Sequence, residues 1–183
     1  MNKLKDIKGD RLVIFDLDDT LVKTDAKIKI VHRRSKKIIM ELTPQEFNNL
    51  ENVSSHMLDF DDFDCPEILR QGRIIHSVFS KLKSYYKKGI PVSIVTARSS
   101  SKLVRDFFLE NGIDIHPSLI IAVNDPVLNL KGSIPEKKQE AIKGLIDSGY
   151  TKLVFFDDSQ DNLILAKDLE GYKQSRVRIV KVD

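Results

Sequence analysis

Cysteine is nearly absent from this sequence, and long apolar runs are missing altogether. The single cysteine, Cys65, excludes an internal disulfide bond and fits a reducing compartment, so we expect a cytoplasmic protein. It has no Cys or His nearby at metal-ligand spacing. No apolar run approaches the ~20 residues that a membrane-spanning helix needs. The first ten residues, MNKLKDIKGD, lack the apolar core of a signal peptide.

Internal repeats and low-complexity tracts are also absent, and no charge dominates. The chain has 183 residues, of which 41% are hydrophobic and 31% charged, as is typical of a globular protein. This length predicts a single domain, residues 1–183, with a sizeable core. The net charge of +3 is too mild to imply a nucleic-acid partner by itself.

Apolar runs alternate with amphipathic segments along most of the chain. Continuous apolar runs are typical of parallel strands covered on both faces, and glycines follow the segments with helical spacing. This alternation predicts an α/β fold with a doubly wound, mainly parallel five-stranded sheet. The expected strands are 12–16, 92–96, 119–123, 153–157 and 177–182, and the expected helices are 66–88, 99–111, 135–148 and 159–170.

The segment from Thr24 to Asp64 interrupts this alternation. Residues 27–30 and 38–40 flank a polar stretch and predict a β-hairpin. Thr43, Pro44 and Glu46 then form the pattern of a helix cap, so a short helix should follow. We therefore expect a small flap inserted after the first strand, over the carboxyl edge of the sheet.

Carboxylates follow two of the predicted strands directly. The stretch FDLDDTL contains Asp16 and Asp18, and FFDDSQDN contains Asp157 and Asp158. If these strands are neighbours in one parallel sheet, their acids converge at its carboxyl edge, where ligands bind in open α/β sheets. So many like charges in one crevice need a cation, and oxygen ligands suit Mg²⁺. The sequence thus predicts a Mg²⁺ site.

Four segments in order resemble the motifs of the haloacid dehalogenase (HAD) superfamily of phosphohydrolases. DLDDT is similar to its DxDxT motif, and the strand ending in Thr96 to its second motif. Lys138, near the start of a helix, resembles the third motif, and Asp157 with Asp158 the fourth. DxDxT alone is a modest signal for this superfamily. Four motifs in order, each at a predicted strand end or helix start, are a strong signal. The chain also resembles small phage-type members and the phosphatase domain of polynucleotide kinase-phosphatases, although it has no kinase P-loop.

The resemblance implies a role for each motif residue. Asp16 would attack phosphorus and form an aspartyl-phosphate, and Asp18 would act as the general acid and base. Mg²⁺ would be held by Asp16, the backbone carbonyl of Asp18, and Asp158, with Asp157 beside or on the metal. The phosphoryl oxygens would be bound by Thr96 and Lys138.

Several assignments remain open at this point. Lys137 competes with Lys138 as the phosphate-binding lysine, although the KQEAI spacing favours Lys138. Arg98, in the TAR segment, would grip a second anionic group of the substrate or be an exposed residue at a helix start. Asp157 or Asp158 could also cap the following helix. Asp161 fits a first-turn helix acid better than a ligand.

Cations concentrate in the predicted hairpin, and two interpretations fit them. If the hairpin overhangs the acidic crevice, it would form a cationic rim that attracts polyanions. Otherwise it is a solvated edge that prevents strand-to-strand aggregation. No aromatic residue for base stacking lies within it. The cations are Lys27, Lys29, Arg33, Arg34, Lys36 and Lys37.

These observations lead to one functional expectation and one alternative. We expect a phosphatase: a Mg²⁺-dependent phosphomonoester hydrolase acting through an aspartyl-phosphate, with nucleotides or nucleic-acid ends among its candidate substrates. The sequence has no room for a large cap domain, and an uncovered site of this kind would suit an extended substrate. The alternative is a catalytically inactive HAD fold that binds phosphate or nucleic acid. No membrane association and no obligate protein partner are expected.

Overall fold

The computed structural model describes residues 9–48, 50 and 56–183, and it divides the chain into two compact units. The first, called here the sheet unit, comprises Met1–Lys23 and Arg73–Asp183. The second, the insertion unit, comprises Thr24–Gly72. The insertion unit therefore extends beyond Asp64. Each unit is described by itself.

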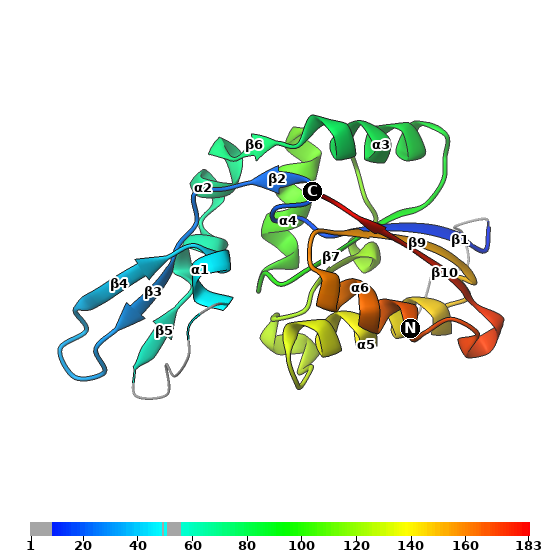
Figure 1. Ribbon diagram of the computed structural model, residues 1–183. Helices are drawn as coiled ribbons and strands as arrows, with labels where there is room; N and C mark the ends of the chain where they lie inside the picture. Colours follow the sequence, from blue (N-terminus) through cyan, green and yellow to red (C-terminus); the bar gives the residue numbers. More distant parts are fainter. Residues whose placement is uncertain (1–8, 49, 51–55) are drawn as a thin grey trace. The chain divides into compact units, whose positions relative to one another are not determined.

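The sheet unit is built on five parallel strands, which confirms the predicted α/β sheet. Their order is β10-β9-β1-β7-β8, so the first strand lies at the centre (Figure 1). The central strand is buried along nearly its whole length, and this explains its unbroken apolar run. The strands are β1 (Arg11–Phe15), β7 (Val92–Thr96), β8 (Ile120–Ala122), β9 (Lys152–Asp157) and β10 (Arg176–Lys181).

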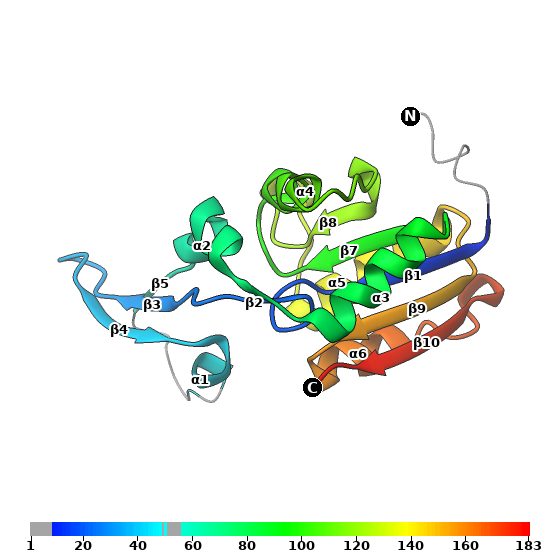
Figure 2. The same cartoon turned by 90° about the horizontal axis from the view of Figure 1, so that it is seen from above.

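Helices cover both faces of this sheet, as in a doubly wound fold. Figures 1 and 2 show α3 and α4 on one face and α5 and α6 on the other. None of the helices within the described ranges is long and apolar enough to cross a membrane. The bounds are α3 (His76–Lys87), α4 (Ser101–Glu110), α5 (Ile134–Asp147) and α6 (Gln160–Lys167), with 3₁₀ turns η2 (Pro117–Leu119), η3 (Pro126–Leu128) and η4 (Tyr172–Gln174).

The single long helix predicted over 66–88 is wrong. The segment is instead α2 (Pro66–Gln71), the short strand β6 (Arg73–Ile74) and α3. Gly72 is extended, with ψ 142°, and ends the first helix. β6 then pairs antiparallel with β2 (Val22–Lys23). Apolar spacing alone could not reveal the break, because the pairing partner lies far away in the sequence.

The packing of β1 against β9 fixes the positions of the acids that follow these two strands. Phe15 of β1 and Phe156 of β9 are register partners, and their rings stack with centroids 4.7 Å apart. The N–H of Asp16 donates to the carbonyl oxygen of Phe156 at 2.9 Å. The pairing of β1 with β9 therefore continues to the residue that carries the first acid.

The insertion unit contains an antiparallel three-stranded sheet and short helices. The predicted hairpin is confirmed as β3 (Ile28–Val31) and β4 (Ile38–Leu42), and β5 (Met57–Asp59) adds a strand that the sequence analysis did not predict. The predicted cap is also confirmed: Thr43 and Glu46 exchange hydrogen bonds at the start of α1 (Pro44–Asn48). A 3₁₀ turn, η1, follows at Asp61–Asp64.

Candidate active site

Three carboxylates meet at the carboxyl edge of the sheet. Asp16 follows β1, and Asp157 with Asp158 lies at the end of the neighbouring β9. One oxygen of each lies within 4.8 Å of the others. Asp16 is 5% exposed and Asp157 is fully buried, while Asp158 is half-buried. The predicted convergence is therefore present for three of the four acids, without Asp18, and we call these three residues the acid cluster.

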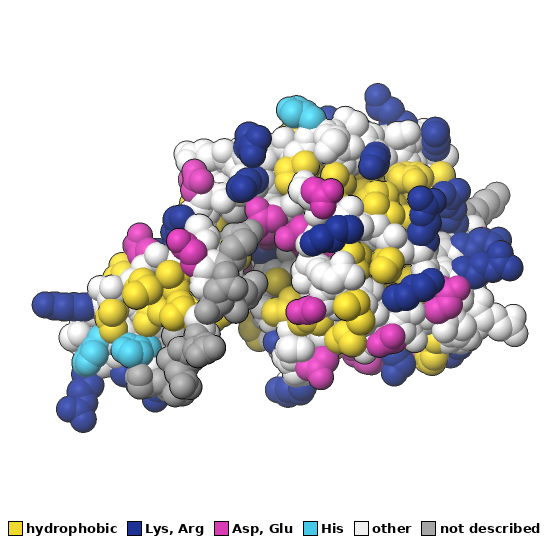
Figure 3. All heavy atoms as spheres, viewed as in Figure 1, with side chains coloured by type: hydrophobic (Ala, Val, Ile, Leu, Met, Phe, Trp, Pro, Cys, Tyr) yellow, Lys and Arg dark blue, Asp and Glu magenta, His cyan; other side chains and the backbone are white. Residues whose placement is uncertain are grey.

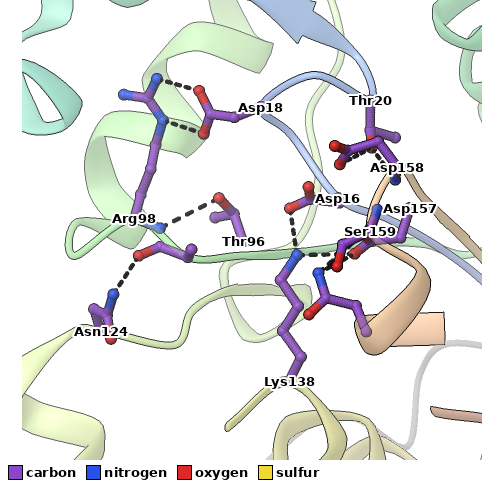
Figure 4. A network of polar contacts seen from close by, with 12 residues as sticks. Asp16, Asp18, Thr20, Thr96, Arg98, Asn124, Lys138, Asp157, Asp158 and Ser159 are labelled. Carbon is purple, nitrogen blue, oxygen red and sulfur yellow. Dashed lines mark hydrogen bonds and ion pairs between the residues drawn. The ribbon is translucent and has the colours of Figure 1, made fainter. Parts of the chain in front are cut away.

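Lys138 supplies a buried cation to this cluster. Its Nζ lies 2.8 Å from Oδ1 of Asp16 and 2.8 Å from Oδ2 of Asp157, and its side chain is only 2% exposed (Figure 4). The preceding residue, Lys137, instead donates to Oδ1 of Asn124 at 2.8 Å. Of the two competing lysines, Lys138 is thus the one that contacts the acid cluster.

The start of α5 is fixed by its cap, which sets where its lysines lie. The N–H and hydroxyl of Ser133 both donate to Oε2 of Glu136, at 2.7 and 2.8 Å. Lys138 follows within the first turns and is among the buried residues of the helix. The polar cap thus fixes the residue at which α5 begins, and this start places the ammonium group of Lys138 against Asp16.

Asp157 is held by donors on both of its oxygens. Oδ1 accepts from the N–H of Ser159 at 2.8 Å and from the side-chain amide of Asn162 at 2.9 Å. Oδ2 accepts from Lys138 and, at 3.1 Å, from the same amide. Asp157 therefore also serves the start of α6. None of the four motif-like segments assigns a role to Asn162, although its place five residues after Asp157, on the next helix, is a usable signal.

Asp158 is linked to the turn that follows β1. The hydroxyl of Thr20 donates to Oδ1 of Asp158 at 3.3 Å and accepts from its N–H at 3.1 Å. Thr20 is fully buried, and it too was missed as a site residue. Lys181, at the end of β10, donates to the backbone carbonyl of Asp158. Asp161 is an exposed first-turn acid of α6, as expected.

Asp18 points away from the acid cluster and pairs with Arg98 (Figure 4). The guanidinium donates from Nε at 2.9 Å and from Nη2 at 2.7 Å to the two carboxylate oxygens. Its side chain is 1% exposed, so the alternative of an exposed arginine at a helix start is wrong. The turn that follows Asp18 has an unusual backbone conformation, since Asp19 has φ 56°.

The end of β7 lies beside this ion pair. Thr96 is fully buried, and its hydroxyl accepts from the N–H of Arg98 at 3.3 Å. The side-chain amide of Asn124 donates to the carbonyl oxygen of Ala97 at 2.6 Å. The loop that carries Thr96 and Arg98 is therefore held by Asn124, a residue beyond β8 that no sequence motif marks.

The charges in the acid cluster are not balanced, and this imbalance favours the binding of a further cation. Burial raises the pKa of Asp16 well above its usual range; Lys138 opposes this shift, and the neighbouring Asp157 adds to it. Burial and then Asp157 also raise the pKa of Asp158. Burial alone would lower the pKa of Lys138, but Asp16 and Asp157 outweigh it and raise the pKa. Three acids thus face one contacting ammonium group, and a metal ion could bind in this cluster.

Comparisons with known proteins do not identify a family. No family model matches the chain, and no curated protein matches it. A crystal structure of a hypothetical protein from Xanthomonas campestris is similar with a TM-score of 0.34 and 18% sequence identity, over 90% of this chain and 69% of that chain. A likeness of this degree carries no argument about function.

Proposed function

We propose that this protein is a Mg²⁺-dependent phosphomonoester hydrolase of the haloacid dehalogenase type. The observation that carries the proposal is the contact of Lys138 with Asp16 inside the acid cluster, at 2.8 Å. A carboxylate with an adjacent buried ammonium group can approach a phosphate dianion that it would otherwise repel. The order of the four motif-like segments along the chain supports the same reaction.

The chemistry assigned to the chain has two covalent steps. An oxygen of Asp16 attacks phosphorus, and the bond to the leaving oxygen breaks to give an aspartyl-phosphate. Asp18 gives a proton to the leaving oxygen and later takes one from the water that hydrolyses the aspartyl-phosphate. Arg98 donates to both oxygens of Asp18, so Asp18 would have to turn away from Arg98 to carry the proton to the leaving oxygen. The phosphoryl oxygens are bound by Thr96 and Lys138.

The acid cluster suits Mg²⁺, which would neutralise part of the phosphoryl charge. Asp16, Asp158 and the backbone carbonyl of Asp18 are the proposed ligands, because Mg²⁺ prefers oxygen donors. Asp157 is better suited to a supporting position, since both of its oxygens already accept hydrogen bonds. The substrates proposed are nucleotides or nucleic-acid ends.

A small chromogenic substrate tests the proposal. p-Nitrophenyl phosphate should be hydrolysed in the presence of Mg²⁺, and Asp16→Asn should lower kcat by at least ~10³, as expected for loss of a covalent nucleophile. The matched control is Asp161→Asn, which alters an exposed acid of α6 and should retain activity. Near-isosteric substitution preserves the fold, which circular dichroism would verify.

The alternative, a binding module without turnover, predicts a different result. The wild-type protein would then bind Mg²⁺ and inorganic phosphate but hydrolyse none of a panel of nucleoside 3′- and 5′-monophosphates, phosphorylated oligonucleotides, sugar phosphates and phosphopeptides. Turnover by Asp16→Asn close to the wild-type rate would also reject Asp16 as the nucleophile.

A further inference from the structure

The strand order leaves part of one sheet face uncovered in the described chain. α3 and α4 lie on this face and pack against β7 and β8, on one side of the sheet centre. β9 and β10 lie on the other side, and Figure 2 shows β10 and the first part of β9 without a helix above them, while α3 reaches the carboxyl end of β9. Val154 and Val180, which point to this face, are accordingly only half-buried.

Cations occupy the rest of this open area. Arg11, Lys152 and Arg176 are register partners on three adjacent strands, so their side chains stand in one row. Arg178 follows Arg176 on the same face, since successive side chains alternate. Lys81 reaches it from α3, with Nζ 5.6 Å from the centroid of the Phe156 ring. These five residues are called the basic face, and all are exposed.

Such a row is unfavourable without a compensating partner. Like charges directly opposite each other on neighbouring strands destabilise a sheet. Lys152 pairs with Asp10 at 3.0 Å, and the guanidinium of Arg11 lies over the Tyr85 ring at 5.8 Å. For Arg178, no ion pair is found within the described part of the chain. The arrangement retains more positive charge than its own acids neutralise.

The basic face borders a hollow of about 630 Å³. Its lining includes Arg11, Lys152, Arg176 and Arg178. An acid also lines it, Glu170, but this residue pairs with Lys167 at 2.7 Å. Figure 3 shows Lys and Arg side chains on the right side of the sheet unit, where β9 and β10 begin in the same view of Figure 1. The hollow is therefore large enough for an anionic ligand and is lined by positively charged side chains.

We propose that the basic face binds the backbone of a single-stranded nucleic acid whose phosphorylated end reaches the acid cluster. This proposal rests on the proposed function in taking Asp16 as the position of the terminal phosphate. It deepens that function by naming the substrate class. The basic face and the acid cluster both belong to the sheet unit, so the proposal requires no residue of the insertion unit.

Spacing favours a strand of nucleic acid over a small anion. Arg176 and Arg178 are separated by about 6.6 Å along β10, close to the spacing of successive phosphates in an extended strand. The strand reaches the level of Asp157 at Lys181, about 10 Å further along than Arg178, although the Lys181 side chain itself points to the opposite face. A chain of a few nucleotides therefore spans the distance. Guanidinium groups suit phosphate because they donate in pairs.

Binding is measured separately from turnover. Fluorescence anisotropy with a short labelled oligonucleotide, in the Asp16→Asn background with Mg²⁺, reports affinity without hydrolysis. Arg176→Gln/Arg178→Gln should weaken binding by on the order of tenfold and reduce the slope of log K against log[salt] by about 1.4, or about 0.7 for each phosphate contact. The charge-matched control is Arg33→Gln/Arg34→Gln in the exposed hairpin loop, which should change neither.

The end of the strand is tested with the same probe. Adding a terminal phosphate, at the 3′ or the 5′ end, should tighten binding if that end lies at the acid cluster. Hydrolysis of p-nitrophenyl phosphate by Arg176→Gln/Arg178→Gln should be unchanged, whereas KM for the phosphorylated oligonucleotide should rise. If p-nitrophenyl phosphate is not hydrolysed at all, the proposed function fails while the binding measurement still stands.

Three results would overturn the inference. One is equal weakening by the hairpin control, which would mean that only total charge matters. The second is no effect of a terminal phosphate at either end. The third is binding of phosphatidylserine vesicles that depends on Arg176 and Arg178 with no dependence for the oligonucleotide, which would assign the basic face to a membrane surface.

Discussion

Replacing Lys138 with glutamine should destabilise the metal-free protein strongly. The ammonium group is 2% exposed and lies 2.8 Å from both Asp16 and Asp157. Without it, buried carboxylates lose their contacting cation. Breaking a buried pair by removing one partner costs about 3–5 kcal/mol, against a typical total stability of about 5–15 kcal/mol. For a protein of this size, the melting temperature should fall by about 6–20 °C.

Lys137→Gln provides a matched control on the same helix. Lys137 is the adjacent half-buried lysine, and its partner is the neutral side chain of Asn124 at 2.8 Å. Its loss should cost no more than about 1.5 kcal/mol, the upper range for an ordinary hydrogen bond. Thermal unfolding followed by circular dichroism in EDTA would compare the two variants. Added Mg²⁺ should raise the melting temperature of Lys138→Gln more than that of the wild type, because it then binds a more negative site.

The double variant Asp16→Asn/Lys138→Gln tests whether the loss in Lys138→Gln comes from an unpaired buried charge. Removing both members of the pair should recover part of the stability lost in Lys138→Gln, while leaving the protein without phosphatase activity. A loss below about 1 kcal/mol in Lys138→Gln, or a loss no larger than that of Lys137→Gln, would refute the reasoning. So would a double variant less stable than Lys138→Gln alone.

Two further predictions concern the acid cluster. EDTA should stop phosphatase activity, and Mg²⁺ but not Ca²⁺ should restore it, because Ca²⁺ takes looser and higher coordination. Asp158→Ala should raise the Mg²⁺ concentration needed for activity more than Asp161→Ala does. The reverse ranking would reject Asp158 as a ligand. Because the folded-state pKa of Asp16 is raised, its contribution to stability is present below its unfolded pKa of about 3.9 and is lost as pH rises through the folded value. Metal-free Asp16→Asn should therefore gain stability relative to the wild type as pH rises toward neutrality, as denaturant unfolding at several pH values would measure; a constant difference would contradict the shift.

The fold was predictable where local pattern alone decides the structure. The central strand β1 is a nearly unbroken apolar run because both of its faces are covered, and the cap at Thr43 and Glu46 is a local signal. The break at Gly72 was not predictable in this way. It depends on pairing between β6 and β2, which is long-range, and the helical spacing on either side masks it.

The same distinction applies to the site. Asp16, Asp157 and Asp158 could be placed together because each follows a strand of one parallel sheet. The pairing of Asp18 with Arg98 joins residues 80 positions apart, and that of Thr20 with Asp158 joins residues 138 apart. No periodicity encodes such contacts. They follow only from the strand order, which brings the ends of β1, β7 and β9 side by side.

The acids of the acid cluster differ in how many of their oxygens already accept hydrogen bonds. Asp157 has donors on both oxygens, and it holds Lys138 and the start of α6 in place. For Asp16, the contacts found within the described residues engage only Oδ1, leaving Oδ2 able to meet a metal or phosphorus. Burying a second and third carboxylate beside one lysine lowers the stability of the metal-free protein. In the proposed function, a cation and an anionic substrate would bind to this cluster together, since each would offset the charge that the other leaves uncompensated.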